Sequence, residues 1–437
     1  MFSAKTYAAR RNMLRTKIGS GIVLFPGNPL SPNNYPNNAY YFRQDSSFLY
    51  YFGLNIPSLA GLIDADTGEE ALYGDDFTVE DIIWTGPQPT LRELGAKVGI
   101  AATHPLSELE KRLRKAISLG RKIHFLPPYR GETKLWLSSL LGIKPTLLHD
   151  YKSVDLMFAV AEMREKKSAE EVEEMERAFQ IGYKMHTLAM KMCRPGVVER
   201  EIAGAIEGVA KSYGSGVSFP SIVSQHGETL HNLNADGVLE EGRLLLCDAG
   251  GETVDNYCSD HTRTYPVSGK FTQKQKDVYN IVLAAHDHVA DIVKPHMMYS
   301  EIHNAAYTTL AEGLAGIGLI KGSAADAVAA GAMTMFMPHG LGTGWAWTCT
   351  TARRWAEREL RLLLDRPTRR QVRDLHLPCG VAPRTGDGDD RRTGALLHPG
   401  ADRQMPGRGP LQGDRRLRRP GRATATSAAS ASRTTSL

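Results

Sequence analysis

The sequence predicts an α/β domain followed by an α+β domain. In residues 1–155, short apolar runs bounded by turn residues alternate with helical patterns, which is typical of a parallel or mixed sheet with helices packed against it. From residue 156, two helical patterns precede a group of strands. An abrupt change of composition after residue 342 marks a further boundary. We therefore divide the chain into residues 1–155, 156–342 and 343–437.

Four apolar runs of the first domain are predicted as strands, namely residues 21–25, 48–52, 62–63 and 123–126. Residues 106–113 repeat apolar side chains at helical spacing. The alternation of the two patterns is the reason for expecting a layered α/β fold.

A capping box opens the second domain, with Ser168 at the N-cap position and Glu171 three residues later. The helix that follows is expected to end at Pro195, and a second helix is expected over residues 199–212. A stripe of side chains at helical spacing is expected to pack in the core: Val172, Met175, Phe179 and Tyr183.

Strands are predicted over residues 219–224, 243–250 and 260–266, and a helical region resumes after Phe271. The second and third strands form a hairpin that turns at Asp255 and Asn256.

Asp248 and Asp260 lie on the two arms of this hairpin and can face each other across it. Two facing carboxylates repel unless a cation lies between them or one is protonated. Spacing alone leaves two explanations open with equal weight: Arg263 neutralises one carboxylate, or both bind a metal ion.

The wider pattern resembles the pita-bread metallopeptidases, and among them the Xaa-Pro aminopeptidases (aminopeptidase P). The motifs that carry the resemblance are D-A-G at 248–250, S-D-H-T-R-T-Y-P at 259–266 and P-H-G-L-G at 338–342. F-R-Q-D-S-S-F-L-Y at 42–50 is similar to a segment of the creatinase/aminopeptidase-P N-terminal domain. The resemblance covers residues 1–342 and implies this N-terminal domain followed by a pita-bread catalytic domain.

The resemblance implies a role for four residues. Asp260 would bridge two metal ions and Asp248 would chelate one of them, while His231 lies near the substrate and His339 stabilises the reacting peptide. Read alone, each histidine would more often be structural. The implied cofactor is a pair of divalent ions, most typically Mn²⁺, which suits carboxylate and histidine ligands. The implied reaction releases the first residue of peptides that have proline in second position.

The chain departs from the family after Gly342. A metal-binding histidine, a further H-D pair and two glutamates are expected there, but Thr343 stands at the histidine position and no glutamate follows Glu359. Because three of five expected ligands are absent, we expect the chain as written to be inactive. We also expect the catalytic domain to be incomplete at its C-terminal end, with an exposed sheet edge and poor solubility.

The genetic code suggests why these ligands are missing. Reading the codons one base earlier, from the third base of Gly342, permits H-G-[LMV]-G-[LMV]-D-[LMV]-H-D. In this motif the single codons of Trp345 and Trp347 force the second glycine and the first aspartate. Shifted codons also permit T-V-E-P-G-L near 389–395 and R-I-E-D-D near 430–435. Our hypothesis is that residues 343–437 are a frameshifted translation.

Composition supports this boundary. Residues 343–437 hold 19 arginines, no lysine and nine acidic residues, a net charge of +10, whereas the first 342 residues carry −5. All 16 tyrosines and 12 phenylalanines precede residue 343. This composition predicts disorder. We do not expect a nucleic-acid-binding arm, since such arms usually use lysine as well and have an aromatic platform.

Composition also limits the class of protein. No signal peptide or membrane span is apparent, and five cysteines without C-x-x-C spacing suit reduced thiols in the cytoplasm. We expect proline-containing peptides as partners and leave self-association into a homo-oligomer open. Two alternatives remain: a non-catalytic pita-bread relative that acts as a binding protein, and a prolidase that cleaves only dipeptides.

Overall fold

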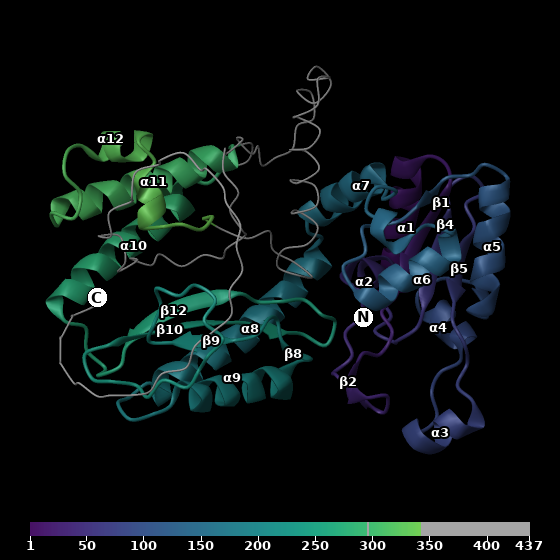
Figure 1. The fold of residues 1–437 in the computed structure, drawn as a ribbon, viewed down its shortest axis with the longest axis horizontal. Helices are drawn as coiled ribbons and strands as arrows, with labels where there is room; N and C mark the ends of the chain where they lie inside the picture. The colour runs from purple at the N-terminus through teal and green to yellow at the C-terminus, as the bar shows by residue number, and fades with distance from the viewer. Residues whose placement is uncertain (295–296, 342–437) are drawn as a thin grey trace, which may run out of the picture.

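A five-stranded sheet forms the centre of the N-terminal half in the computed structural model, which describes residues 1–294 and 297–341 (Figure 1). Its strand order is β6-β5-β4-β1-β7. Strand β4 runs antiparallel to both neighbours, whereas β1 pairs with β7, and β5 with β6, in parallel. Of the two predicted possibilities, a parallel or a mixed sheet, the structure has the mixed one. The strands of this half are β1 (Ile22–Pro26), β2 (Pro32–Tyr35), β3 (Asn38–Ala39), β4 (Ala60–Asp64), β5 (Glu70–Tyr73), β6 (Ala102–His104) and β7 (Ile123–His124).

Helices cover both faces of this sheet, because the side chains of β1 alternate between two buried clusters. Val23 and Phe25 pack with side chains of α1, α2, α4 and α7, whereas Ile22 and Leu24 pack with side chains of α5 and α6. The helices are α1 (Ala4–Ile18), α2 (Ser46–Phe52), α3 (Val79–Thr85), α4 (Leu91–Lys97), α5 (Ser107–Ser118), α6 (Gly131–Leu141), the 3₁₀ turn η1 (Pro145–Leu147) and α7 (Val154–Glu165).

Residues 48–52 form part of helix α2, so the prediction of a strand there is wrong. The Asp45 side chain accepts hydrogen bonds from the backbone N–H groups of Ser47 and Phe48, and Gly53 ends the helix in the left-handed conformation. Every residue of α2 is buried. A short run that is buried all round shows no period, so its sequence does not distinguish a helix from a strand.

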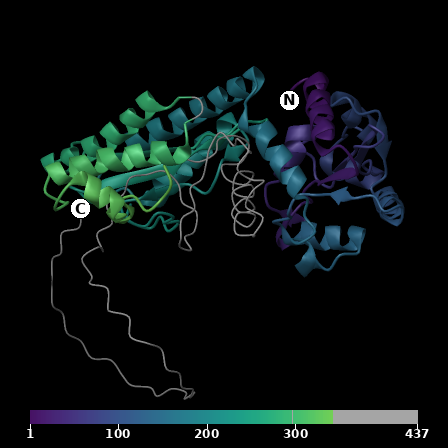
Figure 2. The same ribbon diagram turned by 90° about the horizontal axis from the view of Figure 1, so that it is seen from above.

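The second half has the predicted order of a helix pair followed by strands (Figures 1 and 2). Helices α8 and α9 pack on one face of a three-stranded sheet of order β12-β10-β9, and α10–α12 form a helical group with its own core. The elements are α8 (Ala169–Met192), α9 (Glu199–Tyr213), β8 (Gly216–Val217), β9 (Ile222–Ser224), β10 (Leu244–Ala249), β11 (Gly251–Glu252), β12 (His261–Pro266), α10 (Gln273–Ile292), α11 (Tyr299–Gly316), α12 (Ala324–Ala329) and the 3₁₀ turn η2 (Ala332–Met335).

Helix α8 begins at the predicted capping box, but it buries a different face from the one expected. Val172 and Tyr183 of the apolar stripe are exposed, whereas Glu171 and Glu174 are buried. The two glutamates are hydrogen-bonded to a tyrosine hydroxyl and to Arg177, respectively, which lowers the cost of burying them.

Helix α7 packs in the core of the N-terminal half through Leu156, Val160 and Met163. The proposed division at residues 155/156 falls at the start of this helix, and the packing favours a division after Glu165. The predicted disorder of residues 343–437 lies outside the described residues. Within the described part of the chain, no helix combines the length and apolar character needed to cross a bilayer.

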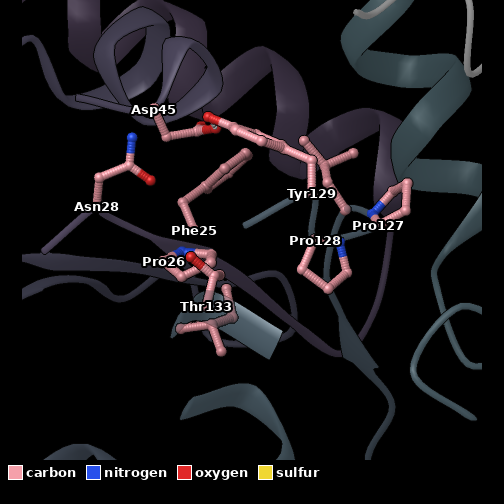
Figure 3. A pocket seen from close by; sticks show the side chains of 10 residues that line it. Phe25, Pro26, Asn28, Asp45, Pro127, Pro128, Tyr129 and Thr133 are labelled. Atoms are coloured by element: carbon pink, nitrogen blue, oxygen red, sulfur yellow. Dashed lines mark hydrogen bonds between the residues drawn. The ribbon is translucent and has the colours of Figure 1, made fainter. Parts of the chain in front are cut away.

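A small pocket opens where β1 and β7 end (Figure 3). The Tyr129 hydroxyl donates a hydrogen bond to Oδ2 of Asp45 (3.2 Å) across it, and three prolines, Pro26, Pro127 and Pro128, line it. Its volume is about 30 Å³. All of its lining residues come from the N-terminal half.

Candidate metal centre

The predicted hairpin is confirmed, because β10 and β12 pair in antiparallel register. Asp248 lies opposite Thr262, and Asp260 directly precedes β12, two residues before Thr262. Side chains two residues apart on an extended strand share a face, so Asp248, Thr262 and Asp260 belong to the same face of the hairpin. Asp248 is 5% exposed and Asp260 is half-buried.

Arg263 lies on the opposite face of the hairpin, since it pairs with Cys247 rather than with Asp248. Its guanidinium is exposed and donates a hydrogen bond to the Thr262 carbonyl oxygen (2.8 Å). The hairpin register therefore favours the metal-ion explanation for the two carboxylates over neutralisation by Arg263.

On the face of the hairpin opposite Asp248 and Asp260, His186 of α8 forms hydrogen bonds with both strands. His186 donates from Nε2 to the Ala249 carbonyl oxygen (3.2 Å), so its Nδ1 accepts from the Tyr265 hydroxyl (2.8 Å) in the neutral ring. Burial lowers the pKa of His186, and burial together with the neighbouring His186 lowers the pKa of His261 to about 4. Burial also raises the pKa of the Cys247 thiol to about 12. His186, His261 and Cys247 are therefore uncharged at neutral pH, and the acidic groups lie on the other face.

His231 is exposed on a loop, residues 226–236, whose base is fixed by a buried carboxylate. Glu199, at the start of α9, accepts hydrogen bonds from the backbone N–H groups of Gln225 (2.7 Å) and Gly237 (3.1 Å). These two residues flank the loop, so Glu199 closes it.

The loop that carries His231 is also attached to the carboxylate face of the sheet. Asn232 donates from Nδ2 to the Ser224 hydroxyl (3.0 Å). Ser224 lies opposite Leu246, two residues from Asp248 on β10, and therefore shares a face with Asp248. The structure thus brings the His231 loop to the same side of the sheet as Asp248 and Asp260.

His339 comes from a separate part of the fold, after η2, where the Tyr307 hydroxyl donates to the Met337 carbonyl oxygen (3.1 Å). It is 3% exposed, its Nδ1 donates to the Gly340 carbonyl oxygen (3.0 Å), and burial lowers its pKa. Within residues 1–341, its Nε2 has no hydrogen-bond partner. A buried imidazole nitrogen in this state can accept a hydrogen bond from a bound peptide or from a further part of the chain.

The donor chemistry of Asp248 and Asp260 fits a divalent cation, because carboxylate oxygens are hard, negatively charged ligands. The described residues contain no group of three or more His, Cys, Asp or Glu side chains placed to hold a metal ion. They therefore supply the carboxylate part of a site, and Thr343, at the expected histidine position, lies outside the described residues.

Comparison with known proteins identifies both halves. The profile of the aminopeptidase P N-terminal domain matches residues 7–124, and the profile of metallopeptidase family M24 matches residues 173–349. The Xaa-Pro aminopeptidase of Escherichia coli is 30% identical over 354 residues, which cover 78% of this chain and 79% of that protein. The chain belongs to the aminopeptidase P family.

Relatives and solved structures agree with this assignment. A probable Xaa-Pro aminopeptidase of Coccidioides posadasii is 28% identical over 74% of this chain and 70% of its own length. Zinc-substituted E. coli aminopeptidase P in complex with product aligns with a TM-score of 0.71 and 26% identity over 80% of this chain and 81% of that one. Proline aminopeptidase P II from Yersinia pestis aligns with a TM-score of 0.70 and 27% identity over 80% of this chain and 82% of its own.

These comparisons confirm the predicted fold class: an aminopeptidase-P N-terminal domain followed by a pita-bread domain. Membership of a metallopeptidase family implies divalent metal ions. The sequence alone does not identify the residues that hold the site, which include Glu199, His186 and Ser224. The partners of Glu199 and His186 lie 26 or more residues away in the chain, so no local sequence signal marks these two residues.

Proposed function

We propose that the gene for this chain encodes a metal-dependent Xaa-Pro aminopeptidase, which releases the first residue of peptides that have proline in second position. The observation that supports this most directly is the placement of Asp248 and Asp260 on one face of the β10–β12 hairpin, in a chain of the aminopeptidase P family. Peptides of this kind would be its partners.

In this proposal Asp248 and Asp260 hold two divalent ions, which we take to be manganese. The ions, when bound, supply Lewis acidity that polarises the scissile carbonyl and lowers the pKa of water. His231 orients the peptide from its loop, whose attachment to Ser224 keeps it on the carboxylate side of the sheet. His339 accepts a hydrogen bond at Nε2 from the reacting peptide, which fits its buried and neutral state.

We further propose that residues 343–437 are translated out of frame, and that the chain as written has lost most of its activity. The sequence supports this through Thr343 at the expected histidine position and the motif that the shifted codons permit. Resequencing the gene across the Gly342 codon tests whether the shift is a sequencing error. An uninterrupted reading of the printed sequence would leave only a lesion in the gene itself.

The decisive assay compares the chain as written with a chain whose reading frame is restored after Gly342, using an X-Pro peptide and Mn²⁺. We expect at least about 10³-fold faster release of the first residue by the restored chain, because metal ions contribute several kcal/mol to transition-state stabilisation. Asp260→Asn in the restored chain, or removal of Mn²⁺ with a chelator, should abolish the gain. Robust turnover by the chain as written would contradict its proposed impairment.

Two alternatives are tested in the same assay. A prolidase would cleave an X-Pro dipeptide and spare a longer peptide, whereas we expect the restored chain to cleave the longer peptide. A binding protein would bind the peptide without releasing its first residue, even with the frame restored and Mn²⁺ present.

A further inference from the structure

The tip of the hairpin that carries Asp248 and Asp260 is inserted into the N-terminal half. The chain reverses direction at residues 253–257, where Asn256 adopts a positive φ of 65° and the Thr253 N–H donates to the Tyr257 carbonyl oxygen (2.8 Å). Tyr257 is fully buried within the N-terminal core, and its ring meets that of Phe2 edge-on at 5.7 Å between ring centres. One buried aromatic side chain therefore attaches the hairpin to the other half.

Glu171 connects this tip to two other elements. Its Oε1 accepts a hydrogen bond from the Tyr257 hydroxyl (3.0 Å) and lies 3.5 Å from the Arg10 guanidinium of α1. Its Oε2 accepts from the Ser168 N–H (2.9 Å) and so completes the N-terminal cap of α8. All three side chains, Arg10, Glu171 and Tyr257, are buried, so this charged junction is formed away from water.

A second contact lies beside the junction. Arg43 of the N-terminal half donates from Nε (2.8 Å) and Nη2 (2.6 Å) to Oε1 of Glu252, which belongs to β11 and is 5% exposed. Glu252 is four residues from Asp248 along the chain. The N-terminal half therefore contacts the hairpin on both strands near its tip.

We propose that Glu171 and Tyr257 are positioning residues for the metal centre, which hold the hairpin, and with it Asp248 and Asp260, in place from the N-terminal half. Within the described residues β12 is the edge strand of the β12-β10-β9 sheet and pairs with β10 alone, so one strand ladder and the contacts near the tip hold it. Contacts at the tip therefore set how often the two strands separate. This inference rests on the proposed function only for the metal-binding role of the two carboxylates.

Hydrogen exchange of the full-length chain without metal tests the coupling. Tyr257→Phe removes the bond to Glu171 and keeps the ring, and it should accelerate exchange of the β10 and β12 amides about tenfold, with little change in β4 and α11. Glu171→Gln keeps a side chain that can complete the capping box but removes the charge opposite Arg10, and it should act at least as strongly. If Glu171→Gln does not fold, Tyr257→Phe decides.

Tyr50→Phe is the matched control, because Tyr50 belongs to the same buried core and its hydroxyl donates to the Met163 carbonyl oxygen (3.0 Å) instead of to the hairpin junction. We expect this variant to change exchange of the β10 and β12 amides less than about twofold. Equal exchange in wild type, Tyr257→Phe and Glu171→Gln would overturn the coupling.

A titration with Mn²⁺, followed by electron paramagnetic resonance, separates positioning from a purely structural role. Asp248→Asn gives the level of Mn²⁺ binding that remains when a proposed ligand is lost. Tyr257→Phe should bind Mn²⁺ about fivefold more weakly than wild type and Tyr50→Phe, because the loss of one buried hydrogen bond has an effect of this size. Faster exchange with unchanged Mn²⁺ affinity would overturn the positioning role. These titrations use the chain whose reading frame is restored after Gly342, with and without each substitution. Lack of Mn²⁺ binding by the restored chain would contradict the proposed function instead, while the exchange data still decide the coupling.

Discussion

The two halves of the molecule use their sheets differently. In the N-terminal half, helices cover both faces, and the side chains of β1 are buried on both sides. In the second half, α8 and α9 cover one face of the β12-β10-β9 sheet, and the other face carries Asp248 and Asp260. The first arrangement buries both faces of a sheet under helices, and the second places two carboxylates on the face that α8 and α9 do not cover.

Buried acidic groups show the same contrast. Asp64 in the N-terminal sheet accepts hydrogen bonds from Arg112 (3.1 Å) and Arg121 (2.5 Å), so arginines of this half neutralise it. Asp248 shares its face with a second carboxylate, while Arg263, three residues after Asp260, lies on the opposite face. An acidic residue paired within its own domain fits a structural role, whereas two carboxylates on one face fit the cation site proposed above.

The largest expected effect comes from truncating one buried side chain in the core of each half, in separate variants. Phe25→Ala removes a ring that lies 4.7 Å from Tyr51 and 5.9 Å from Phe52, and it should destabilise the N-terminal half by about 3–5 kcal/mol. Leu245→Ala in β10 should destabilise the second half by about 2–5 kcal/mol. Hydrogen exchange of each half measures both effects. If either variant accelerated exchange equally in both halves, the two would unfold as one unit and the comparison would fail.

Local patterns in the sequence were sufficient for much of the fold. Strands β1, β4 and β10 have apolar runs between turn residues, β12 follows a turn at Asp255 and Asn256, and α8 has a capping box, so their positions followed from short-range signals. Helix α2 was missed because an aromatic run buried on all sides looks the same in a helix and in a strand.

Long-range pairing could not be predicted in the same way. The buried face of α8 includes Glu171, which is stabilised by Tyr257, 86 residues away in the sequence. Hydropathy alone assigns such a glutamate to the surface and Val172 to the core, the reverse of what the structure shows. The hairpin pattern in the sequence was sufficient to predict the two carboxylates of the candidate site. The contact of Glu199 with the His231 loop could not be predicted, because it uses backbone N–H groups that no sequence motif identifies.

Glu199→Gln tests how firmly the His231 loop is held. The carboxylate accepts two backbone hydrogen bonds while 2% exposed, and an amide has only one accepting oxygen, so we expect a loss of about 1.5–3 kcal/mol. Residues 226–236 should become sensitive to limited proteolysis. Glu201→Gln on the same helix is the control, since Glu201 is exposed and caps the Val198 N–H. Equal sensitivity of the two variants would contradict the role of Glu199.

Acid should weaken the N-terminal half through His124. This ring lies between the Ser153 hydroxyl (2.7 Å) and the Ser20 carbonyl oxygen (3.0 Å), and burial lowers its pKa. Below the unfolded pKa near 6.5 the unfolded chain binds the additional proton, so stability falls as the pH decreases towards the folded pKa, by about 1.4 kcal/mol per pH unit. Urea titrations at several pH values measure this slope. His124→Asn should remove it, and an unchanged slope would assign the acid sensitivity to other groups.

The smallest effect is expected from Asp236→Asn, at the C-terminal end of the loop that Glu199 closes. Asp236 pairs with Arg200 of α9 at 2.7 Å, but the two side chains are 71% and 63% exposed, so water screens the pair and its loss should cost at most about 0.5 kcal/mol. Urea denaturation and proteolysis of residues 226–236 measure this variant alongside Glu199→Gln. Glu199 and Arg200, the partner of Asp236, are adjacent on α9 and contact the same loop. A difference in stability between Glu199→Gln and Asp236→Asn therefore reflects the burial of the contact that is lost and not its location. Comparable losses would mean that surface charge, and not the buried carboxylate, holds the loop that carries His231.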